Sequence, residues 1–198
     1  MNLQNIEKAI VDAIEAIPSQ FPAGARDALW TQAVKRQLGN LGEQVGCSVC
    51  TSGFRGCFDG EWLFDLCWYI NSSEGRLLRL LLAAESEWSR DLKAVRYDFE
   101  KLLVAKAQLK LMVFQATGAA IEQTFRMLSV GIETYEGGST GEIYLLACYD
   151  EGADRFIIKK VRGDDATSVV LPDSSEAIAP KIAGQLAESS GCNEIGRS

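Results

Sequence analysis

Histidine is absent from this chain of 198 residues. Its absence excludes Ser-His-Asp and Cys-His catalytic systems and any zinc site with imidazole ligands. A general base must then be a carboxylate, a lysine, a tyrosine or a metal-bound water. That restriction favours oxygen ligands for a metal, which suit Mg²⁺ or Mn²⁺.

Long apolar runs are also missing. No stretch reaches the roughly 18 apolar residues that a membrane-spanning helix needs, and the longest predominantly apolar stretch, Leu77 to Ala84, fits a buried strand. The first residues lack the basic and apolar regions of a secretory signal. We therefore expect a cytoplasmic protein without a membrane segment. With 47% hydrophobic residues, residues 1–198 suit one domain with a sizeable core.

Positive charge is scarce, since the net charge is −7. An acidic balance counts against a general nucleic-acid binder, although basic residues can still gather on one face. The candidates for such a face are Lys35, Arg36, Arg76, Arg79, Arg90, Lys93 and Arg96.

The six cysteines lie at positions 47, 50, 57, 67, 148 and 192. Cys47 and Cys50 have the spacing of half a zinc site, but they belong to a predicted strand, where positions three apart face opposite sides. Cys67 and Cys148 lie in apolar strand contexts. We expect buried, reduced thiols that pack as small hydrophobic side chains, with zinc binding and redox chemistry as the alternatives.

Hydrophobic periodicity and turn residues divide the chain into helices and strands. Helices are predicted over residues 3–17, 26–44, 98–107, 117–128 and 175–186. Strands are predicted over residues 47–51, 61–70, 77–88, 109–115, 142–149, 155–161 and 168–171. These elements form an N-terminal helix (1–18), a core (26–130) and C-terminal strands with a helix (140–188), within one α/β domain.

Asp65, Glu85 and Glu87 lie within the two longest predicted strands. The turn-rich residues 71–75 join these strands in a hairpin, whose expected register places Asp65 opposite Glu85. Glu85 and Glu87 share a face because strand side chains alternate. Buried carboxylates are costly unless they are paired, and a divalent metal is a suitable partner for two or three converging acids. The pattern therefore predicts a metal site.

A lysine follows these strands in the segment Asp98-Phe99-Glu100-Lys101. Asp98 is a residue type favoured at helix N-caps, so we expect a helix from this point with Lys101 in its first turn. From there a lysine side chain can reach back to the end of the preceding strand. Lys106, farther along the same predicted helix, is the second candidate, and a solvated lysine is the alternative for both.

The order helix, three strands, helix, strand and helix, with acids at these points, resembles the PD-(D/E)xK nuclease superfamily. The resemblance covers roughly residues 26–130. It implies a restriction-endonuclease-like core, in which a mixed central sheet is flanked by helices in αβββαβ order. It also implies that an acid on the second core strand, here Asp65, and an acid on the third, here Glu85, bind a metal that activates water.

The chain departs from the family motif at two positions. Phe64 stands where the motif has proline, and Glu87 stands where it has lysine, as glutamate does in some restriction enzymes. Lys101 is the candidate replacement, since the lysine lies on the following helix in some members. The resemblance also implies that an acid from the helix before the first strand, here Glu43, helps to bind metal; a surface glutamate is the alternative.

These residues predict metal-assisted hydrolysis of phosphodiester bonds, with DNA as the expected substrate. Asp65, Glu85 and the Ser86 carbonyl would hold Mg²⁺, with Mn²⁺ as a substitute, and the metal would lower the pKa of a bound water. Lys101 would orient the nucleophile or stabilise the transition state, and Glu87 would add a ligand or hold a water.

Two alternatives to catalysis follow from the same residues. Asp65 and Glu85 could form structural ion pairs with Arg79, Arg90 or a similar base. The acidic net charge and the lysine missing from its usual position also suit a non-catalytic protein that keeps the nuclease fold and binds a partner nuclease or acts as an accessory subunit.

Cleavage of both strands of a duplex requires two active sites, or one site that repositions. We therefore expect a homodimer or a larger complex. Phe21, Phe54 and Phe58 lie in loop-like settings and could cover an interface. Packing at the edge of the chain's own core is the alternative.

Overall fold

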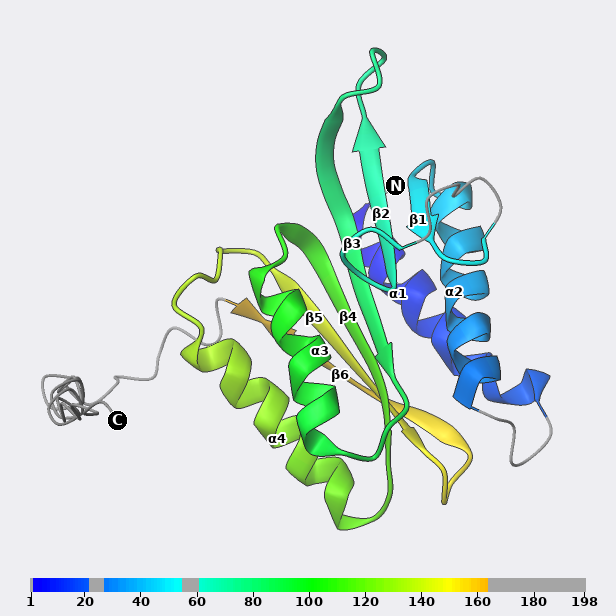
Figure 1. Ribbon diagram of the computed structural model, residues 1–198, viewed down its shortest axis with the longest axis vertical. Helices are drawn as coiled ribbons and strands as arrows, with labels where there is room; N and C mark the ends of the chain where they lie inside the picture. Colours follow the sequence, from blue (N-terminus) through cyan, green and yellow to red (C-terminus); the bar gives the residue numbers. More distant parts are fainter. Residues whose placement is uncertain (1, 22–26, 55–60, 164–198) are drawn as a thin grey trace, which may run out of the picture.

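A six-stranded mixed sheet forms the centre of the molecule (Figure 1). The computed structural model describes residues 2–21, 27–54 and 61–163. The helices are α1 (Leu3–Glu15), α2 (Asp27–Gln44), α3 (Leu92–Val104) and α4 (Ala119–Thr134), with a short 3-10 helix at Pro18–Gln20. The strands are β1 (Ser48–Thr51), β2 (Leu66–Asn71), β3 (Leu77–Glu87), β4 (Ala107–Ala116), β5 (Ile143–Asp150) and β6 (Arg155–Arg162).

The strands lie side by side in chain order. β1, β2 and β3 form an antiparallel meander. Helix α3 then connects β3 to the parallel strand β4, and α4 connects β4 to the parallel strand β5. Strand β6 returns antiparallel to β5. The predicted α/β class, with a mixed sheet flanked by helices, is confirmed.

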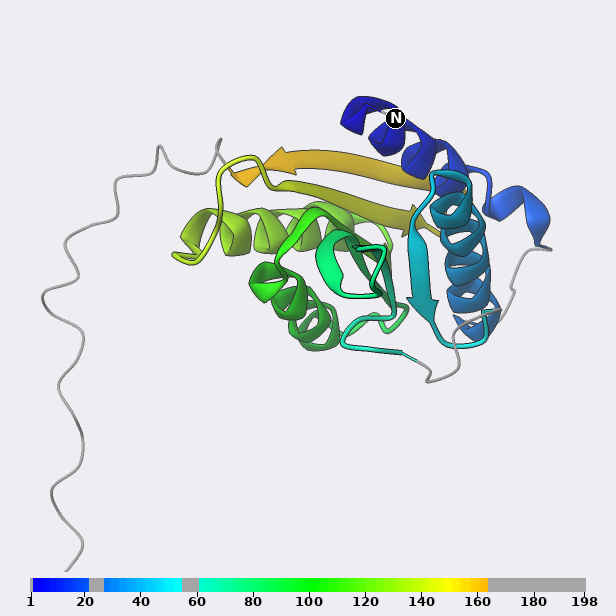
Figure 2. The ribbon, with the colours of Figure 1, turned by 90° about the horizontal axis from the view of Figure 1, so that it is seen from above.

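Helices cover both faces of the sheet (Figure 2). Helices α1 and α2 contribute Ile10 and Leu38 to the hydrophobic core on one face. On the other face, α3 and α4 contribute Phe99 and Phe125. Since strand side chains alternate, even-numbered residues near the end of β3 point towards α1 and α2, and odd-numbered residues point towards α3.

Helix α3 begins at Leu92, so the predicted start at Asp98 is wrong. Asp91 is the N-cap, and its side chain accepts a hydrogen bond from the backbone N–H of Lys93 (3.0 Å). Val95, Phe99 and Leu102 are buried at helical spacing. This apolar stripe extends the helix by a full turn and more before Asp98, which therefore lies inside the helix.

The other predicted elements agree with the structure more closely. Strand β2 begins at Leu66 instead of residue 61, because its pairing with β1 starts there, opposite Thr51. Helix α4 continues to Thr134, beyond the predicted end at residue 128. The predicted strand 168–171 and helix 175–186 lie outside the described residues. In the part of the chain that the structure describes, no helix is long and apolar enough to cross a membrane.

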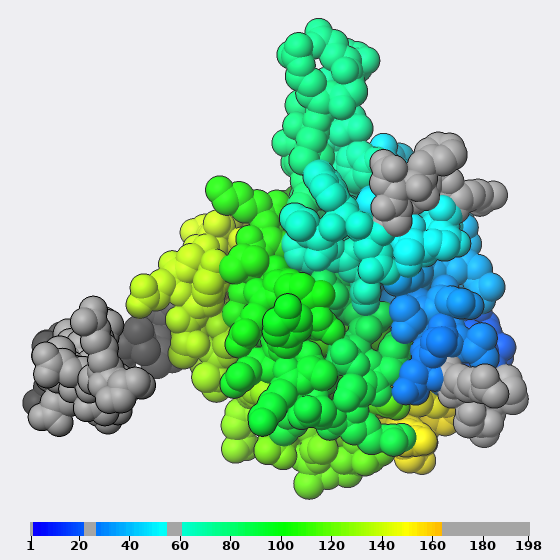
Figure 3. Space-filling view, viewed as in Figure 1, coloured from blue at the N-terminus to red at the C-terminus, as the bar shows by residue number. Residues whose placement is uncertain are grey.

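The turn between β2 and β3 projects beyond the body of the molecule (Figure 3). Strand β4 starts to pair with β3 only at Leu80, so the base of the projecting turn has no strand on that side. Leu77 and Leu78 are consequently exposed, whereas the residues from Leu81 to Ala84 are buried. The stretch predicted as a buried strand is therefore buried only in its second half.

Two of the three phenylalanines considered for an interface pack against the chain itself. The ring of Phe21 lies 5.3 Å from that of Trp30, and a Cβ added to Gly39 would lie only 2.6 Å from the Phe54 ring. Phe58 lies outside the described residues. The homodimer stays a prediction without support from Phe21 and Phe54.

Cys47 and Cys148 are free thiols. Cys47, Cys67 and Cys148 are buried, and Cys50 is half-buried. Burial raises the pKa of Cys148 to about 12, so this thiol stays protonated. Cys57 and Cys192 lie outside the described residues.

Candidate active site

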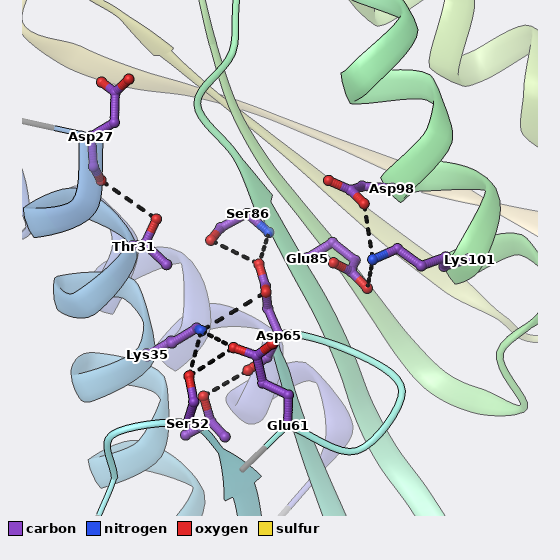
Figure 4. A network of polar contacts seen from close by, with 11 residues as sticks. Asp27, Thr31, Lys35, Ser52, Glu61, Asp65, Glu85, Ser86, Asp98 and Lys101 are labelled. Atoms are coloured by element: carbon purple, nitrogen blue, oxygen red, sulfur yellow. Dashed lines mark hydrogen bonds and ion pairs between the residues drawn. The ribbon is translucent and has the colours of Figure 1, made fainter.

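The β2–β3 hairpin brings Asp65 and Glu85 together. Leu66 pairs with Ala84, which places Asp65, one residue before β2, beside Glu85 on β3. The predicted placement of Asp65 near Glu85 is confirmed, and the hairpin contains two register shifts, at Trp68/Tyr69 and at Ile70/Asn71. Glu85 lies on the face of the sheet that α3 covers, and its neighbour Ser86 points to the opposite face. In Figure 4 the Asp65 side chain contacts Ser86 and Lys35 of α2, and the Glu85 side chain contacts Lys101 of α3.

Asp65 is held by the backbone of the neighbouring strand. Its Oδ2 accepts hydrogen bonds from the N–H of Ser86 (2.8 Å) and from the Ser86 hydroxyl (3.1 Å). Its Oδ1 lies 3.8 Å from the Nζ of Lys35 on α2. The side chain keeps 24% of its surface exposed. Asp65 is thus fixed in position with part of its side chain still exposed.

Glu85 is the most deeply buried acid of the site, with 1% of its side chain exposed. Burial is the main reason why the pKa of Glu85 rises to about 8. The Lys101 ammonium opposes this rise from 2.9 Å, and the negative charges of Asp65 and Asp98 add to it. The carboxyl group therefore titrates near neutral pH.

Lys101 reaches Glu85 from the last turn of α3, not from the first turn as predicted. Its Nζ also lies 2.9 Å from Asp98 Oδ1, one helical turn earlier. Burial lowers the pKa of Lys101, but the contacts with Asp98 and Glu85 outweigh it and hold the pKa above its ordinary value. The ammonium is therefore charged and fixed between two carboxyl groups.

Glu87 extends the same group of side chains towards Asp98. Its Oε1 accepts a hydrogen bond from the Ser89 N–H (2.5 Å). Burial is the largest cause of a raised Glu87 pKa, and the hydrogen bond to the Asp98 carboxyl group raises it further. Glu87 therefore holds its proton more tightly than an exposed glutamate does.

Lys35 is a site residue that the sequence indicated only as one of several basic candidates. With 11% of its side chain exposed, its Nζ donates hydrogen bonds to Ser52 Oγ (3.0 Å) and to Glu61 Oε1. Burial raises the pKa of Glu61, but the hydrogen bonds from Lys35 and Ser52 outweigh it and lower the pKa overall. One signal was present: Lys35 lies between Val34 and Leu38, on the side of α2 that faces the sheet.

Glu43 and Lys106 lie away from these side chains. Glu43 is exposed near the end of α2, about 12 Å along the helix axis from Lys35 at 1.5 Å per residue. Lys106 is exposed just before β4, whose first residue pairs with Leu80. It is therefore roughly 20 Å from Glu85 at about 3.3 Å per strand residue. Neither Glu43 nor Lys106 therefore lies beside Asp65 and Glu85, where the sequence predicted them.

The donor atoms at this site suit a hard cation. No group of three or more His, Cys, Asp or Glu side chains within residues 2–21, 27–54 and 61–163 is arranged to hold a metal ion. Mg²⁺ does not require one, because it keeps several waters and is usually bound by one or two carboxylates together with substrate phosphates. Asp65 and Glu85 supply two carboxylates. The raised pKa of Glu85 indicates that Lys101 does not fully offset the cost of burying a negative charge there.

No protein-family model, no curated protein and no solved structure matches this chain. Inference about function therefore depends on the residues of the site.

Proposed function

We propose that this protein is a Mg²⁺-dependent nuclease that hydrolyses phosphodiester bonds of DNA. The observation that carries the proposal is the contact between the buried Glu85 carboxyl group and the Lys101 ammonium (2.9 Å) beside Asp65. It provides two acids and a charged lysine at one end of a hairpin, as the resemblance to the PD-(D/E)xK superfamily implies. The order α2, β1, β2, β3, α3, β4, with an antiparallel meander followed by a parallel strand, supports a restriction-endonuclease-like core.

In this proposal Asp65, Glu85 and the Ser86 carbonyl hold the metal. When bound, Mg²⁺ supplies positive charge at the scissile phosphate and lowers the pKa of a water molecule. Glu85 must lose its proton to act as a ligand, and its raised pKa makes this step dependent on pH.

Lys101 has two tasks in the proposal. Its ammonium, fixed by Glu85 and Asp98, can donate a hydrogen bond to a phosphate oxygen or orient the attacking water. Donors that are already in position stabilise charge in the transition state without reorganisation at the moment of reaction. Glu87 adds a ligand or holds a water in the proposal.

Cleavage of supercoiled plasmid with Mg²⁺ or Mn²⁺ tests the proposal. We expect cleavage by the wild type and a loss of about a hundredfold or more in Asp65→Asn, Glu85→Gln and Lys101→Met. Lys93→Met is the matched control, because Lys93 is an exposed lysine of the same helix. Thermal denaturation in EDTA shows whether each variant folds. The proposal fails if the wild type leaves the plasmid intact, or if Asp65→Asn cleaves as fast as the wild type.

A non-catalytic interaction protein with the same fold is the second candidate. The observation in its favour is that lysines already face both acids, Lys101 at Glu85 and Lys35 at Asp65. Such pairs can be purely structural. Calorimetry with Mn²⁺ separates the two functions: binding that Glu85→Gln abolishes supports the nuclease, and no heat of binding in the wild type supports the interaction protein.

A further inference from the structure

A hollow of about 520 Å³ adjoins the acids on the α2 side of the sheet. Its walls come from α2 and from the loop that follows β1. The residues that line it are mostly polar or basic: Gln32, Lys35, Arg36, Asn40, Ser52, Gly53 and Phe54. None of the described residues that line it has an acidic side chain, in a chain with a net charge of −7.

Lys35 belongs both to the hollow and to the candidate active site. Its Nζ lies 3.8 Å from Asp65 Oδ1, and its side chain also lines the hollow. A group bound in the hollow at Lys35 is therefore a direct neighbour of a group bound at the acids. Arg36, the next residue, is exposed and lines the same space.

The contacts of Glu61 mark a place for an oxyanion. One carboxylate oxygen of Glu61 accepts hydrogen bonds from both Lys35 Nζ and Ser52 Oγ, the latter at 2.7 Å. An ammonium and a hydroxyl that converge on one oxygen are donors that a phosphate also uses. The Glu61 side chain is 41% exposed, so a ligand from solvent can reach this place.

We infer that the hollow binds a phosphate of a DNA strand next to the phosphate at the acids. Lys35 and Ser52 donate to this second phosphate from inside, and Arg36 adds charge at the rim. Without DNA, Glu61 accepts the hydrogen bonds of Lys35 and Ser52. When a DNA strand binds, its phosphate replaces the Glu61 carboxylate at these donors. The inference rests on the proposed function, because it assumes a nucleic-acid substrate at Asp65 and Glu85.

Binding of fluorescein-labelled DNA, measured by anisotropy in EDTA, tests the inference without cleavage. One arm uses a single strand and the other a duplex. Lys35→Gln and Arg36→Gln should weaken binding about tenfold, as expected for a lost hydrogen bond to a charged group. Each should also reduce the slope of log affinity against log salt by about one. Glu61→Gln should bind more tightly than the wild type, because it removes a competing charge. The matched control is Arg126→Gln, an exposed arginine on α4.

The outcomes separate this inference from the proposed nuclease. Wild-type affinity in both Lys35→Gln and Arg36→Gln, or weaker binding in Glu61→Gln, would overturn it, and so would an absence of wild-type binding in both arms. Arg36 and Glu61 are exposed enough that their variants remain informative if Lys35→Gln does not fold. If the variants bind as expected and the wild type still leaves plasmid intact with Mg²⁺, the nuclease proposal fails and the phosphate site stands. If the wild type cleaves plasmid and the variants bind DNA normally, the nuclease stands and the phosphate site fails.

Discussion

Ionisation of Glu85 should weaken the fold as the pH rises. Its side chain is 1% exposed, and burial raises its pKa from 4.5 to about 8. The native state therefore holds this proton more tightly than the unfolded chain does. The resulting stability is fully present below the unfolded pKa and is lost as the pH rises through the folded pKa. With about 1.4 kcal/mol for each pKa unit, the loss is about 4 to 5 kcal/mol.

Urea unfolding of wild type and Glu85→Gln in EDTA measures this loss. Glutamine keeps the size of the side chain and cannot ionise. We expect the two proteins to have similar free energies of unfolding at about pH 5, and the variant to be the more stable at about pH 9. The control is Glu100→Gln, which removes an exposed acid of α3 and should follow the wild type throughout. Parallel curves for wild type and Glu85→Gln across this range would refute the reasoning.

Three further substitutions test buried contacts by urea unfolding. Trp68→Phe should cost about 1 to 3 kcal/mol, because the buried carbonyl of Leu38 loses the hydrogen bond from Trp68 Nε1 (3.0 Å); an unchanged midpoint would contradict this. Gly42→Ala should destabilise by about 1 to 3 kcal/mol although alanine favours helices, since its Cβ would lie 2.6 Å from Trp68 Nε1; a gain in stability would show that the indole can move away. Lys110→Met should cost about 3 to 5 kcal/mol, because it leaves Glu142 without the fully buried ammonium that lies 2.7 Å away. The double variant Lys110→Met/Glu142→Leu should recover most of that loss. If its loss of unfolding free energy instead equals the sum of the losses in Lys110→Met and Glu142→Leu, the two side chains do not stabilise each other.

The sequence predicted the hairpin and its register because both depend on local chemistry. Residues 71–75 are turn formers, and the flanking strands are apolar, so the hairpin and its approximate register follow from the position of the turn. This placed Asp65 beside Glu85, as the structure has it. Two register shifts between β2 and β3, at Trp68/Tyr69 and Ile70/Asn71, complete the alignment. The contact of Lys101 with Glu85 also appears, although from a different turn of the helix.

The remaining site residues depend on tertiary contacts. Asp98 looked like a cap because aspartate is common at caps, but Asp91 takes that place and the buried Val95 continues the helix between them. Glu43 was chosen by resemblance, whereas the docking of α2 against the sheet brings Lys35 to Asp65. Packing of α2 against Trp68 and its neighbours decides which residues of α2 face the end of β3. The hydrophobic periodicity of α2 alone does not determine this orientation.

The acids and Lys101 belong to one uninterrupted stretch of chain, a hairpin followed by the next helix. Contacts between neighbouring elements close short loops, which costs little entropy, and such elements often unfold together as one cooperative unit. Lys35 comes from α2, which precedes this unit and docks against it from the opposite face of the sheet. We therefore expect the parts of the site to separate on partial unfolding. A state in which α1 and α2 have detached would keep the Glu85–Lys101 contact and lose the phosphate hollow. The proposed catalytic groups would then stay together after the groups that bind the DNA strand have separated from them.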